Sequence, residues 1–143
     1  MKGSPSSGEP TTVPGSTAFC PACWERVPGA HVVCPACGVE IARYLAETDY
    51  SAQLIYAAKY LDARRRLIAI WLLGERREKR AIPVLHRLTL TAKSDVHLAK
   101  AAVDALAKIG GAEARHSIEL ARGHHPSRFV RRAAAQVLRV SFQ

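Results

Sequence analysis

The feature that most constrains this chain is an amphipathic helical pattern that occurs three times from Arg65 onward. The pattern is clearest from Leu98 to Gly110, where apolar residues recur at intervals of three and four and therefore share one helical face. That face consists of Leu98, Ala101, Ala102, Ala105, Leu106 and Ile109. On the charged opposite face, Asp104 stands four residues before Lys108, the favourable order for a surface ion pair.

The stretches that begin at Arg65 and Val130 repeat this pattern without gaps. Their spacings are 33 and 32 residues, so that Ile68, Ala101 and Ala133 align. The helices that follow the first two stretches also align, Ala81 with Ala114 and Leu85 with Ile118. A period in the low thirties, two helices per unit and alanines on the contact face predict an all-α helical solenoid.

Six helices are expected in this array, and the turn residues fit their ends. They span 51–60, 65–74, 81–90, 95–110, 112–122 and 127–142. Pro83 suits only the first turn of the third helix, Ser94 or Asp95 can cap the fourth, and Gly110-Gly111 ends it.

Counted from Arg65, the array has about two and a half repeats, fewer than the roughly three that a solenoid generally needs. Gln143 follows directly on a first helix of the repeat. We therefore expect an open C-terminal end. Either Val140 and Phe142 fold back to close it, or it docks a partner or a second copy of the chain.

All four cysteines lie ahead of the array in two short motifs, Cys20-Pro-Ala-Cys23 and Cys34-Pro-Ala-Cys37. Four sulfurs in two tight turns suit one tetrahedral Zn²⁺ ion at ~2.3 Å, and they close the site to catalysis. Two disulfides would need an oxidising compartment, and a redox motif would need a βαβ pattern that is missing here. The sequence thus predicts one structural zinc ion.

Here the chain resembles the zinc-ribbon family, whose paired Cys-Pro-x-Cys turns match Cys20, Cys23, Cys34 and Cys37. Trp24 departs from the family pattern, which has glycine at that position, whereas Gly38 follows it. The array resembles HEAT repeats, in particular the short bacterial form related to phycobilisome lyases. The family pattern Val-Arg-x-x-Ala-x-x-Ala-Leu-Gly is matched best from Val130 to Leu138. The resemblance implies a helical stack used mainly as a binding surface, without implying lyase activity.

Composition divides the chain into four parts. Residues 1–17, rich in Ser, Pro, Gly and Thr, are predicted to be a disordered tail. The zinc ribbon is expected at 18–40, a linker at 41–49, and the repeat array at 50–143.

Charge is distributed unevenly along the chain. The formal net charge is −2 over residues 1–49 and +11 over residues 50–143, which favours either acidic partners for the array or an internal docking of the front part on the array. The N-terminus lacks the apolar stretch of a secretory signal, and no apolar run is long enough for a membrane helix. We therefore expect a cytoplasmic protein that does not enter a membrane.

Basic residues cluster at the turns between repeats and could follow a phosphate backbone or bind an acidic protein. Trp71 either packs within the chain or is exposed as a binding anchor, and the adjacent His124 and His125 are expected to be solvated. The candidate partner-binding residues are Arg64, Arg65, Arg66, Trp71, Arg128, Arg131 and Arg132.

No grouping of residues typical of a catalytic site is present in the sequence. The sequence therefore predicts a non-enzymatic adaptor that binds a protein partner. The alternative is an accessory protein whose basic edge between repeats binds nucleic acid.

Overall fold

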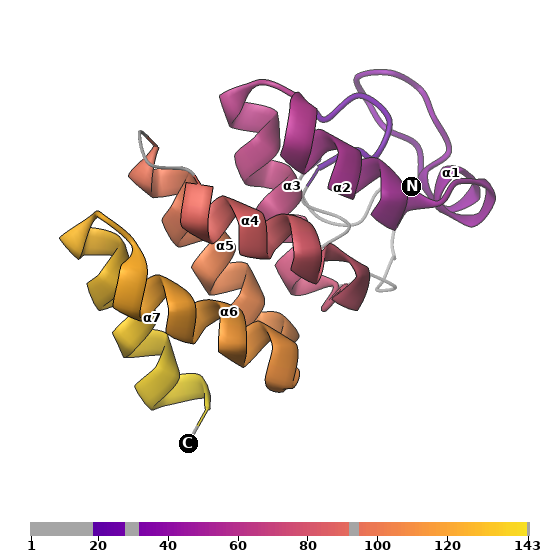
Figure 1. The fold of residues 1–143 in the computed structure, drawn as a ribbon. Coiled ribbons are helices and arrows are strands. Elements are labelled where there is room, and N and C mark those ends of the chain that lie inside the picture. Colours follow the sequence, from indigo (N-terminus) through magenta and orange to yellow (C-terminus); the bar gives the residue numbers. More distant parts are fainter. Residues whose placement is uncertain (1–18, 28–31, 92–94, 143) are drawn as a thin grey trace. The chain divides into compact units, whose positions relative to one another are not determined.

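The computed structural model describes residues 19–27, 32–91 and 95–142. The chain divides into two compact units, Met1–Tyr50 and Ser51–Gln143. The predicted tail, residues 1–17, lies outside the described residues. Within the described ranges, regular structure is helical and strand pairing is limited to two isolated bridges, which confirms the all-α class (Figure 1).

The helices of the structure follow the repeat pattern closely. They are α1 (Ile41–Glu47), α2 (Tyr50–Tyr60), α3 (Ala63–Glu75), the 3-10 helix η1 (Lys79–Ala81), α4 (Ile82–Thr91), α5 (Val96–Ile109), α6 (Gly111–His124) and α7 (Arg128–Ser141). Each of the six predicted array helices is present with ends shifted by at most a few residues. Pro83 is the second residue of α4, in its first turn as predicted.

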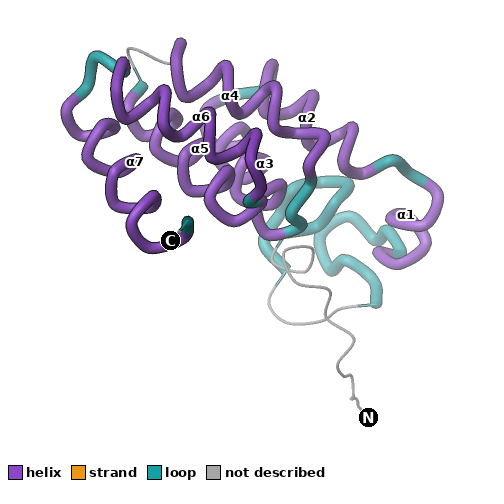
Figure 2. The backbone as a smooth tube through the Cα atoms, turned by 60° about the horizontal axis from the view of Figure 1, so that its bottom comes forward, coloured by secondary structure: helices purple, strands orange, loops and turns teal. Residues whose placement is uncertain are grey.

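The array is built from two rows of helices (Figures 1 and 2). Helices α3, α5 and α7 pack side by side in one row, and α4 packs on α6 in the other. Helix α5 also contacts both α4 and α6, and α7 contacts α6. In chain order, the six helices of the array also form three consecutive pairs, α2–α3, α4–α5 and α6–α7.

The aligned side chains of Ile68, Ala101 and Ala133 are half-buried, and the residue after each of them belongs to the core of the array. Ala69, Ala102 and Ala134 are all fully buried. The pattern did not predict the burial of Ala99 and Val103, which are also fully buried. Their burial follows from the position of α5, because a helix with neighbours on several sides buries more than one stripe.

Three helices of the same row begin with a side-chain cap at the same repeat position. Asp62 accepts a hydrogen bond from the Arg65 N–H at 3.0 Å, and Asp95 accepts one from Leu98 N–H at 3.0 Å. Ser127 accepts one from the Val130 N–H at 3.4 Å. Each cap satisfies a backbone donor that the first helical turn leaves free. These contacts fix where α3, α5 and α7 start.

Two details of the array differ from the sequence predictions. Asp104 pairs with Lys100 at 2.7 Å instead of with Lys108, and Lys108 pairs with Glu75 of α3. Pairing across the row was not predictable from spacing within one helix. Val140 is 71% exposed, so it does not fold back, while Phe142 is half-buried.

The first unit contains the cysteines and α1. Two antiparallel bridges join Phe19 to Arg26 and Val33 to Glu40. Residues 41–49, where a linker was expected, contain α1, and its first residue, Ile41, belongs to the apolar cluster around the cysteines.

Candidate functional site

The two cysteine motifs form the same turn twice, 14 residues apart. The Cys20 N–H donates to the Glu25 carbonyl at 2.8 Å, and the Cys34 N–H donates to the Val39 carbonyl at 2.9 Å. Each of these pairs closes a loop that presents two sulfurs from one short segment. The local geometry therefore follows from the repeated Cys-Pro-Ala-Cys sequence.

The residue after each second cysteine reverses the chain with a positive φ. Trp24 has φ 71° and Gly38 has φ 82°. In both turns the N–H of this residue donates to the carbonyl of the first cysteine, at 3.0 Å and 2.9 Å. Trp24 thus keeps the turn that glycine usually forms, and the departure noted in the sequence does not change the backbone geometry of the first turn.

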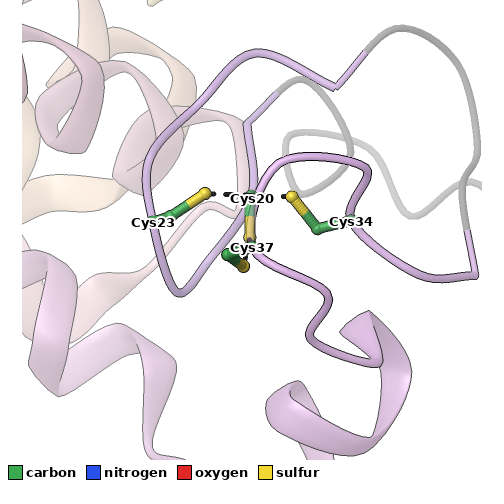
Figure 3. A group of neighbouring side chains, drawn as sticks. All are labelled: Cys20, Cys23, Cys34 and Cys37. Atoms are coloured by element: carbon green, nitrogen blue, oxygen red, sulfur yellow. Dashed lines mark hydrogen bonds between the residues drawn. The ribbon is translucent and has the colours of Figure 1, made fainter.

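The four sulfurs converge on one point, as Figure 3 shows. The Cys20 and Cys37 sulfurs lie 3.7 Å apart, and those of Cys23 and Cys34 lie 3.8 Å apart. All four lie within 4.8 Å of one another. Sulfurs at ~2.3 Å from a tetrahedral zinc ion are ~3.8 Å from each other, so these separations fit such an ion. They are far longer than the ~2.05 Å of a disulfide, and all four cysteines are free.

Hydrogen bonds and burial distinguish the sulfurs from one another. The Ala22 and Ala36 N–H groups donate to the sulfurs of Cys20 and Cys34 at 3.4 Å and 3.3 Å. Burial raises the pKa of the Cys20 thiol to about 12. A hydrogen bond from the Cys37 backbone N–H lowers the pKa of Cys34 to about 7. A cation would favour the thiolate at every position, because a metal ligand must be deprotonated.

The apolar cluster around the sulfurs is small. Its buried members are Cys20, Val27, Cys34 and Ile41, and two of these four are metal-ligand candidates themselves. So few apolar side chains give little stability from burial alone. The four cysteines lie close enough together to hold a metal ion.

Comparison with protein families matched the HEAT-repeat family model to residues 40–139, more than half of the chain. The chain belongs to the HEAT-repeat family. No curated protein and no solved structure matched it. In the described part of the chain, every helix is too short or too polar to cross a membrane.

Two of the arginines predicted to bind a partner have contacts inside the HEAT array. Arg66 donates to the Ala58 carbonyl of α2 at 2.9 Å. Arg131, at the equivalent position of α7, donates to the carbonyls of His125 and Pro126 at 2.7 Å and 2.9 Å. Arg66 contacts a carbonyl in the last turn of α2, and Arg131 contacts two carbonyls of the turn that follows α6. Both arginines therefore have a structural role in the array, and their role in partner binding stays a prediction.

Helix α3 carries the other candidates of the first HEAT repeat. Arg64 and Arg65 are exposed, and Arg65 lies 3.7 Å from the carboxylate of Asp62. Trp71 is 41% exposed, and the Lys108 ammonium lies 5.7 Å from the centre of its ring. Trp71 therefore contacts a side chain of α5 and is also part of the surface, and its role as a binding anchor stays a prediction.

Arg128 and Arg132 line a hollow between α5 and α7. This hollow has a volume of about 590 Å³ and is lined by Lys100, Arg128, Phe129, Arg132, Ala133 and Gln136. The sequence reasoning missed Phe129, Lys100 and Gln136. Only Gln136 had a signal in the sequence, since residues 128, 132 and 136 lie one helical turn apart on α7. Phe129 is outside this row, and Lys100 belongs to α5.

The prediction that both adjacent histidines are solvated is wrong for one of them. His124 is exposed, but His125 is only 1% exposed. Its Nδ1 accepts a hydrogen bond from the Ser127 N–H at 2.9 Å, and its carbonyl binds Arg131. His125 thus takes part in the turn between α6 and α7. The sequence could not predict this role, because His124 and His125 are adjacent residues of the same type.

Proposed function

We propose that this protein is a non-enzymatic adaptor that binds a protein partner through its HEAT array and carries one structural zinc ion. HEAT repeats generally serve as protein-interaction scaffolds. The observation that supports the role most directly is the array itself, whose exposed side chains include the large apolar residues Tyr56, Leu67, Trp71 and Phe129. Exposed aromatic side chains are frequent anchors at protein interfaces.

Zinc is the metal that best fits the cysteine cluster. Four thiolates in a tetrahedron are typical of Zn²⁺ or of an iron–sulfur site, and a closed four-sulfur site leaves no open position for substrate. The 3.7 Å and 3.8 Å sulfur separations support a single ion of this size. Four free thiols also suit a reducing compartment, which supports a cytoplasmic location. We assign the turns around the cysteines to the zinc-ribbon class, and the array to the phycobilisome-lyase-related form of HEAT repeat.

Native mass spectrometry of the full chain tests the metal. We expect one zinc ion per chain, retained in Cys37→Ser only at lower affinity and lost from Cys20→Ser/Cys34→Ser. Binding of iron in preference to zinc would contradict the assignment. A Cys20–Cys23 or Cys34–Cys37 disulfide in protein purified under reducing conditions would contradict it as well.

The alternative of a nucleic-acid-binding protein is less well supported by the array. Arg66 and Arg131 of the predicted basic edge are engaged with backbone carbonyls, and Lys100 and Lys108 are paired with carboxylates. These contacts leave fewer basic side chains for phosphate groups.

Cross-linking capture tests the adaptor role against this alternative. The zinc-loaded chain is expected to capture a defined protein at a yield that falls far less steeply with salt than nucleic-acid binding does. Capture of nucleic acid with a steep salt dependence would favour the alternative. If no defined protein is captured at any salt concentration, the adaptor role is wrong.

A further inference from the structure

We propose that the hollow between α5 and α7 binds an acidic segment of the partner protein. Carboxylates of that segment pair with Arg128 and Arg132, and an apolar side chain packs on Phe129. The proposal rests on the adaptor role and specifies its site. It concerns only the array, because α5 and α7 both belong to the unit Ser51–Gln143.

The two arginines supply the charge of the hollow. Arg128 and Arg132 are both exposed and stand one turn apart on α7. Within the described residues neither forms an ion pair, whereas the exposed arginines 43, 65 and 115 each lie within 4 Å of a carboxylate on their own segment. A guanidinium group can hold a carboxylate through two parallel hydrogen bonds. The pair therefore provides two anchoring points with the spacing of one helical turn.

Lys100 bounds the hollow from α5. Its ammonium group lies 2.7 Å from the Asp104 carboxylate, so most of its charge is balanced locally. The net positive charge of the hollow consequently comes from α7. This asymmetry favours a segment whose carboxylates lie along α7 over one that interacts equally with both helices.

Phe129 gives the hollow an apolar side. Its side chain is 47% exposed, and its ring stands edge-on to the His97 ring with centroids 6.1 Å apart. Ala133 adds a small side chain to the lining one turn further on. An aromatic ring next to arginines is the combination most often found at the energetic centre of protein interfaces.

A peptide fits this surface better than a nucleic acid does, because unbalanced positive charge is interrupted in the middle helix of the row. The residue equivalent to Arg132 in α5 is Lys100, which is paired with Asp104, and the equivalent in α3 is Leu67. A phosphate backbone needs cations along its length. A short segment that combines carboxylates with an apolar side chain needs only the α7 pair and Phe129.

A second hollow of about 370 Å³, between α4 and α6, provides an internal contrast. Its lining includes Glu113 and two histidines, His86 and His116, but no lysine or arginine. It should repel rather than attract a carboxylate-rich segment at neutral pH. The acidic segment is therefore expected to bind the hollow between α5 and α7 and not the hollow between α4 and α6.

Fluorescence anisotropy with the full zinc-loaded chain tests the proposal. The probes are two labelled dodecapeptides of equal charge, one of glutamate and leucine and one of glutamate and serine, and an oligothymidylate of the same charge. We expect the Glu/Leu peptide to bind most tightly. Arg128→Gln/Arg132→Gln should weaken it by about tenfold and Phe129→Ala by several-fold.

The control variant is Lys59→Gln/Arg122→Gln, which removes the same charge from exposed positions of α2 and α6 outside the lining. It should change the affinity by less than about twofold, because distant surface charges are screened. Equal weakening by both double variants would overturn the proposal. So would an unchanged affinity in Phe129→Ala, no binding of the Glu/Leu peptide, or tighter binding of the oligothymidylate.

Capture of the partner separates this proposal from the adaptor role. If Arg128→Gln/Arg132→Gln captures the same protein as the wild type, the hollow is not the site and the adaptor role stands. If the wild type captures no protein, the adaptor role fails irrespective of what the peptides show.

Discussion

Trp24 adopts a backbone conformation that ordinarily belongs to glycine. Its φ of 71° nearly equals the 82° of Gly38 at the same place in the second turn. A side chain in this region costs about 1–2 kcal/mol. Trp24 is only 7% exposed, and burying a large aromatic ring stabilises by more than this strain costs.

The balance between strain and burial at Trp24 predicts an unusual order of variants. Trp24→Ala loses the buried ring but keeps the strained φ, whereas Trp24→Gly loses the ring and relieves the strain. We expect Trp24→Gly to bind Zn²⁺ roughly fivefold more tightly than Trp24→Ala, because about 1 kcal/mol of folding free energy appears in metal affinity. Competition with a chromogenic chelator measures both affinities.

Gly38→Ala is the matched control for this prediction. A Cβ at Gly38 would meet nothing within 4 Å, so the substitution adds backbone strain alone. It should weaken zinc binding by a similar factor, roughly fivefold. If Trp24→Ala and Trp24→Gly bind Zn²⁺ with equal affinity, the positive φ carries no energetic cost in this turn.

Asp62 links the stability of the array to pH. The Arg65 backbone N–H and the nearby Arg65 guanidinium lower the pKa of the Asp62 carboxyl. Because this pKa is lower in the folded chain, the stabilisation is complete above the unfolded-state pKa and is lost as pH falls through the folded-state value. We expect the melting-temperature advantage of the wild type over Asp62→Asn to shrink between pH 6 and pH 2.

Ser127→Ala provides the comparison, since it removes a cap that does not titrate. Its deficit in melting temperature, followed by circular dichroism, should change little over the same pH range. A wild-type advantage over Asp62→Asn that stays constant down to pH 2 would contradict the role of the Asp62 charge.

Individual residues also show how far sequence reasoning could reach. The four cysteines were found because a metal site imposes a short, recognisable spacing. The roles of Arg131 and His125 were missed because they depend on contacts with backbone carbonyl and amide groups. Such contacts form only once two helices meet, and a charged side chain looks the same in sequence whether it binds a carbonyl or a partner.

At the scale of helices, α3 and α5 approach each other closely at Gly74. A Cβ built on Gly74 would lie 2.9 Å from the Cα and 3.0 Å from the Cβ of Ala105. The backbone of α5 cannot move away without disturbing its other neighbours, α4, α6 and α7. Gly74 is therefore a packing requirement of the α3–α5 pair, although glycine normally weakens a helix.

This contact predicts that Gly74→Ala destabilises the array. Alanine should gain up to about 1 kcal/mol from helix propensity, but overpacking against a backbone costs about 1–3 kcal/mol. We expect a net loss in the free energy of unfolding, measured by urea titration of the helical circular dichroism signal. Gly123→Ala in α6 is the control, because nothing lies within 4 Å of its Cβ. An increase in stability for both variants would contradict the close approach.

The helices themselves were predictable because their apolar period and their caps agree. Asp95 caps the N-terminus of α5 and Gly110 caps its C-terminus, as expected from the sequence. What periodicity could not provide was the second buried side of α5, seen in Ala99 and Val103, or the ion pair from Lys108 to Glu75. Both depend on which helices become neighbours, and a pattern within one helix does not specify this.

At the scale of the whole molecule, the two units draw their stability from different sources. In the array, Leu54, Leu73, Leu85, Leu106 and Ile118 are all fully buried. The first unit has the small cluster around Cys20 and Cys34. We therefore expect burial of apolar side chains to be the main source of stability in the array, and metal binding to be the main source in the cysteine unit.

This difference predicts that metal removal affects one unit and spares the other. Of the described helices only α1 lies wholly within Met1–Tyr50, so a strong chelator should leave most of the helical circular dichroism signal unchanged. In Trp71→Phe the remaining tryptophan is Trp24, which is buried, and its emission should shift to the red as the cysteine unit unfolds. Added Zn²⁺ should reverse the shift, and Cys20→Ser/Cys34→Ser should show the red-shifted emission from the start. Loss of the helical signal together with the Trp24 shift would contradict independent stability of the array, and would mean that the metal supports both units.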